Sequence, residues 1–336
     1  MSLLLEVEDL HVEIPLTGGR LQAVRGIDLA VDRGEVLCIV GESGCGKSMT
    51  SLALMSLLPA RARRRAAAIR FEGLELTGLS KRRMSELRGD RVGMIFQEPT
   101  TSLNPVLTIG EQLEEVWLRH RRGGRAAARA RALELLDKVG IPSPRQRLRQ
   151  YPHQLSGGLR QRVMIAMALM CGPDLIIADE PTTALDVTIQ AQVLLLLKRL
   201  QRELGMAMIL ITHDLGVVAR MADRVLVMYA GQVVETGTVR EIFSNPLHPY
   251  TQGLLRCLPG QGGAAAGGRL GTIGGTVPVI LGELAGCAFA ARCPYVFDAC
   301  RAAAVPLVDA APLHRYRCLL PVEQLRRVAL SPGQAP

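Results

Sequence analysis

Two patterns of apolar residues divide the chain into predicted strands. The two-residue period of a half-buried strand is seen near the N-terminus, in LLLEVEDLHVEI and LQAVRGIDLAVDRG. Short, wholly apolar runs follow further along, in EVLCIV, DLIIAD and MAMILIT. Such runs are typical of strands that are buried on both faces. We therefore predict an antiparallel region at the start of the chain and a separate set of buried strands.

The middle of the chain has the period of helices instead. Residues from about 105 to 168 are mostly helical by pattern, with an interruption at VGIPSPRQRLRQYPHQLSGG. A further helix, at residues 189–204, separates two of the buried strands, which implies parallel strands covered by helices. The predicted fold is α/β, with a mainly parallel sheet core, an antiparallel β subdomain and a helical subdomain at about residues 105–168.

A change of composition divides the last quarter of the chain from the rest. The stretch LPGQGGAAAGGRLGTIGG is typical of a flexible linker. We therefore predict a main domain at residues 1–258, a glycine-rich linker at 259–285, and a small C-terminal module at 286–336 that contains four cysteines.

Charge and composition narrow the class of protein. The net charge of +9 is dispersed along the chain, so we interpret the basic runs as solvated surface and expect no nucleic-acid partner. Attraction to anionic lipid is the alternative. We expect no signal peptide and no membrane span, and hence a cytoplasmic chain. In a reducing compartment, eight cysteines are unsuited to a disulfide framework.

The clearest chemical motif is GESGCGKS, which matches G-x-x-x-x-G-K-[ST] between a predicted strand and a predicted helix. The backbone amides of such a loop, together with the helix N-terminus, bind phosphates. Lys47 is expected to reach the β- and γ-phosphates, and the Ser48 hydroxyl to hold Mg²⁺. The predicted ATP-binding residues of this P-loop are Gly41, Glu42, Ser43, Gly44, Cys45, Gly46, Lys47 and Ser48.

A second motif, DLIIADEP, supplies two carboxylates at the end of a buried strand. Asp179 can hold Mg²⁺ through water, and Glu180 can polarise the water that attacks the γ-phosphate. Carboxylates that only cap the next turn are the simpler alternative. Lys47 in the same chain favours the catalytic interpretation.

A third motif, LSGGLRQR, opens another helix with Ser156, Gly157 and Gly158. Alone it would indicate only a capped helix. Beside the P-loop it is a second phosphate-binding helix start, and one nucleotide does not need two from the same subunit. We therefore expect a dimer in which each chain lends this turn to the ATP of the other.

These motifs, in this order, resemble the ATP-binding subunit of ABC transporters over residues 1 to about 258. The resemblance implies a P-loop NTPase of the ABC nucleotide-binding type that hydrolyses ATP. It also implies that Gln97 in IFQEP binds near ATP and senses Mg²⁺ and the membrane subunit. In the same way, Asp186 in TALD would contact the dimer partner, and His213 in ITHD would contact the γ-phosphate.

Further stretches resemble the dipeptide and oligopeptide importers, namely EPTTSLNP, YPHQLSGG, DEPTTALDVTIQAQ, VMYAGQVVETG and HPYTQGLL. The resemblance implies peptide import powered by ATP. The implied partners are a second ATP-binding subunit, identical or homologous, two transmembrane permease subunits and an extracytoplasmic substrate-binding protein. The chain would then be peripheral, at the cytoplasmic face of the plasma (inner) membrane. Nickel or glutathione import, a non-transport ABC-type ATPase and a regulatory protein without turnover are the alternatives.

One departure from the family concerns the base of the nucleotide. The family places an aromatic residue near the N-terminus to stack on adenine, but no aromatic residue precedes Phe71 here. Ile14 or Leu21 stands at the corresponding position. We expect plain apolar contact there, and therefore weaker discrimination against GTP.

The cysteines of the tail have the spacing Cys287-x5-Cys293-x6-Cys300-x17-Cys318. A short segment with few large apolar residues can be stabilised by a metal, and thiolate sites bind zinc or iron–sulfur clusters. The spacing lacks the close pairs of zinc ribbons. It resembles the C-terminal segment of peptide-importer ATPases, some of which carry a four-iron four-sulfur cluster. We expect such a cluster at these four cysteines, with zinc or free thiols as alternatives.

Overall fold

The computed structural model describes residues 3–183, 185–258 and 272–330. The chain forms two compact units, which are described separately. The first unit contains residues up to Leu4, Val31–Glu35 and Gly78–Ile211, and the second contains Leu5–Ala30, Val36–Thr77 and the chain from Thr212 onward. Residues 259–271 of the predicted linker and 331–336 of the predicted C-terminal module lie outside the described residues.

The first unit contains three parallel strands in the order β9, β8, β7. They are β7 (Val92–Ile95), β8 (Leu175–Asp179) and β9 (Ala207–Thr212). Their residues are buried throughout, which explains why these segments are apolar without alternation. The helices of this unit are α2 (Lys81–Leu87), α3 (Pro99–Ser102), α4 (Ile109–His120), α5 (Gly124–Lys138), α6 (Pro144–Arg147), the 3₁₀ turn η1 (Pro152–Gln154), α7 (Gly157–Ala168) and α8 (Val187–Leu204).

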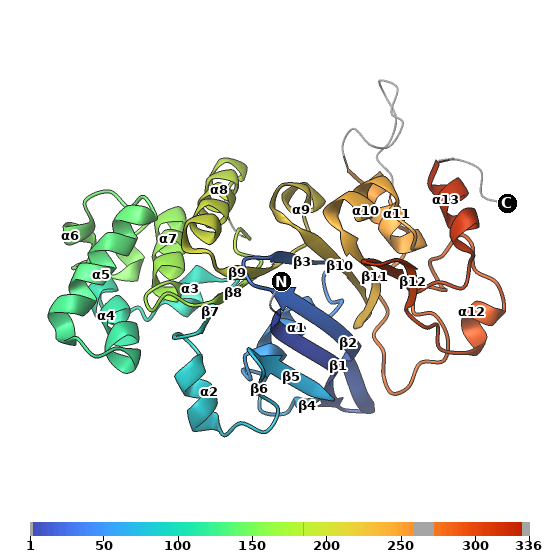
Figure 1. Ribbon diagram of the computed structural model, residues 1–336, viewed down its shortest axis with the longest axis horizontal. Helices are drawn as coiled ribbons and strands as arrows, with labels where there is room; N and C mark the ends of the chain where they lie inside the picture. Colours follow the sequence, from blue (N-terminus) through green and yellow to red (C-terminus); the bar gives the residue numbers. More distant parts are fainter. Residues whose placement is uncertain (1–2, 184, 259–271, 331–336) are drawn as a thin grey trace. The chain divides into compact units, whose positions relative to one another are not determined.

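Local capping sets where these helices begin. At the start of α4, the Thr108 hydroxyl accepts from the amide of Glu111 at 3.3 Å, and the Glu111 carboxylate accepts from the amide of Thr108 at 2.7 Å. This reciprocal capping box satisfies two amides that a helix start leaves without partners. The helices α4, α5 and α7 pack on one another (Figure 1). Buried leucines and alanines of α5 make that packing close.

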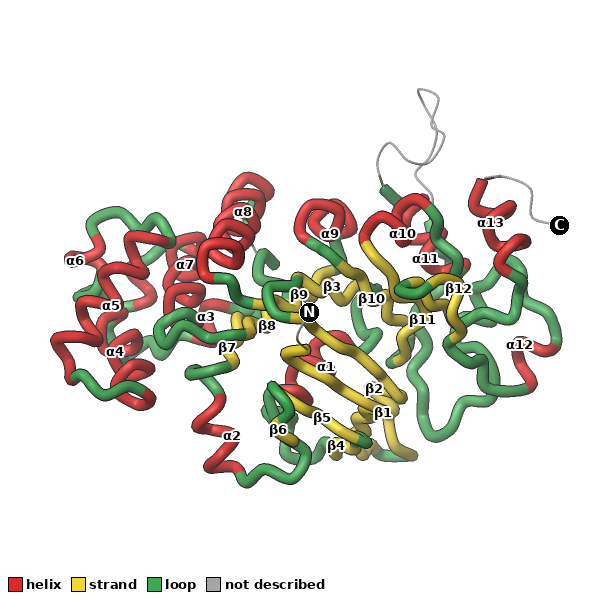
Figure 2. Tube along the Cα trace, viewed as in Figure 1, coloured by secondary structure: helices red, strands yellow, loops and turns green. Residues whose placement is uncertain are grey.

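The second unit begins with a five-stranded sheet of order β2-β1-β5-β6, in which β4 also pairs with β1. The strands are β1 (Leu3–Leu16), β2 (Gly19–Asp32), β4 (Arg63–Arg65), β5 (Ala68–Phe71) and β6 (Leu74–Glu75). Figure 2 shows β1, β2 and β5 side by side in yellow. Pairing of β1 with β4 and β5 is antiparallel. Buried and more exposed residues alternate over much of β1, as its sequence pattern predicted.

A second sheet of this unit has the order β12-β13-β11-β10-β3. Its strands are β3 (Val36–Val40), β10 (Arg224–Tyr229), β11 (Gln232–Thr238), β12 (Val308–Ala311) and β13 (His314–Tyr316). Strands β3 and β10 are parallel, whereas the other neighbours are antiparallel. The helices are α1 (Lys47–Leu54), α9 (Leu215–Met221), α10 (Val239–Ser244), α11 (Pro249–Arg256), α12 (Ala299–Ala302) and α13 (Val322–Leu330).

The C-terminal residues therefore extend a sheet of the second unit. Strand β13 adds to the edge of β11, with Glu235 opposite Tyr316. Tyr316 and Leu325 are buried against Leu247, which precedes α11. Burial of these side chains gives the tail an apolar anchor on the second unit.

Candidate nucleotide-binding site

The P-loop lies in the second unit between β3 and α1, which is the strand–loop–helix context that the motif requires. Every residue of β3 is buried, so the strand is a fixed support for the loop. Ser43 and Gly44 at the tip of the loop are exposed. The loop is thus open to a ligand at its tip and anchored at its base.

Gly46 shows why the motif needs glycine. Its φ of +103° is a left-handed conformation, and it forms the N-cap of α1. A Cβ at this position would lie 2.3 Å from the carbonyl oxygen of Ala23. No side chain fits there, so the close turn into α1 depends on glycine.

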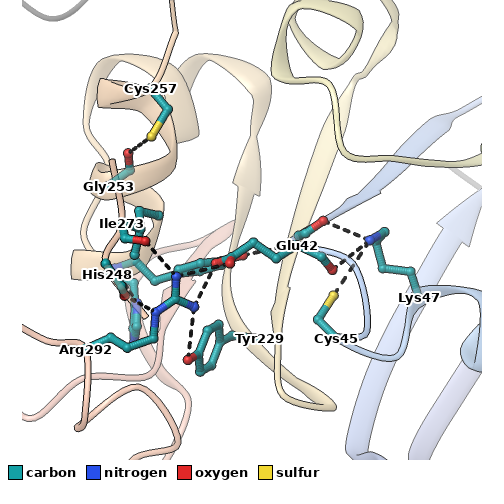
Figure 3. Close-up of polar contacts among 12 residues, drawn as sticks. Glu42, Cys45, Lys47, Tyr229, His248, Gly253, Cys257, Ile273 and Arg292 are labelled. Atoms are coloured by element: carbon teal, nitrogen blue, oxygen red, sulfur yellow. Dashed lines mark hydrogen bonds and ion pairs between the residues drawn. The ribbon is translucent and has the colours of Figure 1, made fainter. Parts of the chain in front are cut away.

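Lys47 turns its side chain back along the loop, as Figure 3 shows. Its Nζ donates to the carbonyl oxygens of Gly41 at 2.8 Å and Glu42 at 3.0 Å. The side chain is only 4% exposed. Cys45 is also buried, and its burial raises the pKa of the thiol although Lys47 opposes the shift. The ammonium group is therefore held within the loop that we expect to enclose the phosphates.

The two carboxylates of the second motif, which we predict to be catalytic, lie in the first unit. Asp179 ends β8 and is 5% exposed. Glu180 follows with a backbone φ of +44°, a conformation that residues other than glycine adopt rarely. The Glu180 carboxylate accepts from the hydroxyl of Thr183 at 2.9 Å and from Nε2 of Gln97 at 3.4 Å. The structure thus brings Glu180 and Gln97 together, two residues that the sequence analysis selected from separate motifs.

The remaining motif residues lie at helix starts or just before one. Ser156 is the N-cap of α7, which begins with Gly157 and Gly158, and its hydroxyl accepts from the amide of Leu159 at 3.4 Å. Ser156 and Gly157 are exposed, so they are accessible to a second chain. Asp186 caps α8. His213 is exposed just before α9. Ala184 of the TALD stretch lies outside the described residues.

The four tail cysteines line one small cavity of about 20 Å³, in the second unit. Burial raises the pKa of Cys287, that of Cys293 to about 12 and that of Cys318 to about 11. Within residues 3–183, 185–258 and 272–330, however, no three His, Cys, Asp or Glu side chains are placed to hold a metal ion. The expected metal-holding arrangement of the four thiols is therefore not formed here, and the cavity between them has room for about one water.

The helices of the described residues also include none with the length and apolar composition needed to cross a membrane.

Comparison with known proteins adds to this geometry. Residues 24–183 match the family model "ABC transporter", and residues 234–300 match "Oligopeptide/dipeptide transporter, C-terminal region". The dipeptide transport ATP-binding protein DppD of Bacillus subtilis (strain 168) is 49% identical over 332 residues, which cover 98% of each chain. This chain belongs to the ABC transporter family. The oligopeptide transport ATP-binding protein OppD of the same organism is 54% identical over 293 residues, covering 87% of this ABC protein and 82% of OppD.

Solved ABC structures agree with the fold. The ATP-binding cassette MJ0796, in a dimeric structure bound to ADP and Pi, aligns with a TM-score of 0.63 and 28% identity over 70% of this chain and 99% of that chain. CbiO1 from Clostridium perfringens, part of the transporter complex cbiONQ, aligns with a TM-score of 0.62 and 29% identity over 73% of this chain and 92% of that chain. The α/β ABC-type fold and the family resemblance inferred from the motifs are confirmed.

Two residues near the P-loop of this ABC protein were missed from the sequence. Tyr250 accepts from the Glu42 amide at 2.9 Å, and Arg292 pairs with the Glu42 carboxylate. Tyr250 belongs to HPYTQGLL, a stretch that served only to indicate the subfamily. No sequence signal singled out Arg292.

Proposed function

We propose that this chain is the ATP-hydrolysing subunit of an ABC importer for dipeptides or oligopeptides. The observation that carries the proposal is a complete P-loop, with Lys47 held inside it, in a chain whose residues 234–300 match the C-terminal region of peptide transporters. The near full-length similarity to a dipeptide transport ATP-binding protein supports the same substrate class. Nickel or glutathione import would use the same subunit chemistry with other partner chains.

Each motif residue has a role in the proposed reaction. Lys47 would neutralise the β- and γ-phosphates, while Ser48, Asp179 and Gln97 would hold Mg²⁺ directly or through water. Glu180 would orient and polarise the attacking water, and His213 would contact the γ-phosphate. Gln97 donates to the Glu180 carboxylate, and this contact would couple Mg²⁺ binding to the activation of water.

The proposed working form is a dimer of ATP-binding subunits. Each chain would offer Ser156, Gly157 and Gly158 to the nucleotide on the other, with Asp186 near the dimer contact. Exposure of Ser156 and Gly157 suits this role. The dimer would bind two permease subunits at the cytoplasmic face of the plasma membrane, and an extracytoplasmic protein would deliver the peptide.

Glu180→Gln tests the catalytic assignment. The amide keeps the shape of the side chain but cannot accept a proton, so we expect MgATP binding to persist while hydrolysis falls roughly a hundredfold or more. Glu283→Gln, an exposed carboxylate, is the matched control. Normal steady-state hydrolysis by the Glu180 variant would contradict the assignment. Uptake of labelled dipeptide and of nickel in a deletion strain separates the two cargo classes.

We further propose that the four tail cysteines hold a four-iron four-sulfur cluster, with zinc as the alternative. Four thiols around one cavity are a suitable donor set, and they would have to open that cavity and lose their protons on binding. The group would stabilise the tail, which has only a small apolar core. Iron, zinc and acid-labile sulfide analysis of anaerobically purified protein tests this, and about four irons with four sulfides per chain, lost in Cys293→Ser, is the expected result. Protein without any of these elements would contradict it.

A further inference from the structure

A single side chain of the C-terminal segment reaches the P-loop. The Arg292 guanidinium donates from Nη1 to Glu42 Oε1 at 3.0 Å and from Nη2 to Glu42 Oε2 at 3.1 Å (Figure 3). This is the two-pronged geometry that makes arginine–carboxylate pairs strong. The Arg292 side chain is 5% exposed and that of Glu42 is 30% exposed, so solvent and salt screen the pair only partly.

The guanidinium is fixed by its surroundings, so it reaches Glu42 in one orientation. It donates to three further oxygens, those of the Gly274 carbonyl at 2.7 Å, the Ile273 carbonyl at 3.1 Å and the Tyr229 hydroxyl at 3.3 Å. It also lies 5.7 Å from the ring centre of Tyr229 and 5.9 Å from that of Phe289. Cation–π contacts with these rings and an acceptor for each of its nitrogens hold the guanidinium in place.

The backbone and the side chain of Glu42 are both held by hydrogen bonds. Its amide donates to the Tyr250 hydroxyl at 2.9 Å, and burial raises the pKa of that phenol, which keeps it neutral. Its carboxylate is bound by Arg292, and its carbonyl oxygen accepts from Lys47 Nζ at 3.0 Å. The residue that contacts the phosphate-binding lysine is therefore positioned from the C-terminal part of the chain.

Phosphate chemistry does not require a carboxylate at this position of the motif, which any residue can occupy. An unpaired carboxylate in the loop would repel the phosphates of ATP. Arg292 removes that repulsion and also fixes the loop backbone. Both effects favour the nucleotide-bound state.

The segment that carries Arg292, residues 287–300, also carries three of the four tail cysteines. Cys293 follows it directly, and the Cys287 amide donates to the Cys300 carbonyl at 2.7 Å, which closes the segment into a loop. We propose that Arg292 is a positioning residue that holds the P-loop in its phosphate-binding conformation, so that order in residues 287–300 sets the affinity for ATP. The inference rests on the proposed ATP-binding role of the P-loop.

The test measures the affinity of the full chain for Mg²⁺ and a non-hydrolysable ATP analogue by calorimetric titration. Arg292→Gln should weaken binding roughly tenfold, within the usual range of coupling between sites. Arg292→Lys keeps the positive charge but not the two-pronged geometry, so its affinity should lie between those of the wild type and Arg292→Gln. Arg301→Gln, the same change at an exposed position of the segment, should leave the affinity unchanged. Melting curves identify any variant that fails to fold.

Two combinations separate positioning from general stabilisation. Glu42→Gln with Arg292→Gln removes the unpaired carboxylate, so the double variant should bind more tightly than Arg292→Gln alone. Cys293→Ser should weaken binding in the wild-type background and change it less than twofold when Arg292→Gln is present.

Three results would overturn the inference alone: Arg292→Gln binding within twofold of wild type, a double variant that binds no more tightly than Arg292→Gln, or equal effects of Cys293→Ser in both backgrounds. A wild-type chain that bound no nucleotide would instead overturn the proposed function, and this inference with it.

Discussion

A buried carboxylate, Glu235, joins the start of α11 to strand β13. Its side chain has no exposure to solvent. Oε1 accepts from the Leu247 amide at 2.7 Å and from His314 Nε2 at 2.8 Å, and Oε2 accepts from the His248 amide at 2.8 Å. Replacing Glu235 by Gln or by Leu therefore removes different numbers of these bonds.

The cost of each replacement follows from this bonding pattern. Glutamine can keep Oε1 in place, so only the His248 amide loses its acceptor, and we expect a loss of about 2 kcal/mol in the free energy of unfolding. Leucine leaves all three buried donors without an acceptor. At about 1–3 kcal/mol for each donor, less the gain from an apolar side chain, the expected loss is about 5 kcal/mol.

Thermal unfolding and hydrogen exchange check these values. Glu235→Leu should lower Tm by at least roughly 10 °C, and Glu235→Gln by a few degrees. Exchange should quicken first in Pro249–Arg256, because the lost bonds hold the start of that helix. Glu283→Gln is the exposed control and should change Tm little. A Glu235→Leu variant with the Tm of the wild type and unchanged exchange protection in Pro249–Arg256 would refute the assigned cost of the lost hydrogen bonds.

Three other changes have sharp expected outcomes. Gly46→Ala should abolish MgATP binding because its Cβ would collide with the Ala23 carbonyl. Gly44→Ala shares the cost of a positive φ (+79°) but meets no atom within 4 Å, so it should weaken binding without abolishing it. Equal binding by both variants would contradict this. Thr108→Ala should cost about 1 kcal/mol in the free energy of unfolding, as for other N-cap losses, and an unchanged denaturation midpoint would count against the capping box. Because β1 and β2 contain no aromatic residue to stack on adenine, hydrolysis assays should show only a weak preference for ATP over GTP. A strong preference for ATP would contradict the expected apolar contact with the base.

Sequence patterns predicted three of the fully buried strands, although not β7, and the partly alternating strand β1. EVLCIV became β3 and DLIIAD became β8, because a short apolar run between turns has few other stable placements. Strands β12 and β13 could not be predicted. They are only four and three residues long and mix polar with apolar residues, so their existence depends on pairing with β11 rather than on any local period.

The same distinction applies to the site. The P-loop residues are contiguous, and the sequence alone indicated their strand–loop–helix context. Arg292 could not be found in this way, because its partner Glu42 lies 250 residues earlier in the chain. Cysteine spacing correctly indicated that four thiols share one region, but the metal-holding arrangement that we expected from it is not present in the described residues.

The motifs of the nucleotide site all lie before residue 258, yet the contacts that hold Glu42 and Glu235 continue beyond it. A chain ending at 258 would keep every nucleotide motif but lose Arg292 from Glu42 and His314 from Glu235. The first loss removes the arginine partner of a carboxylate in the P-loop, and the second removes one of the three hydrogen-bond donors of a buried carboxylate. The C-terminal residues therefore contact the P-loop directly, so the support that we propose for nucleotide binding extends beyond the motifs themselves.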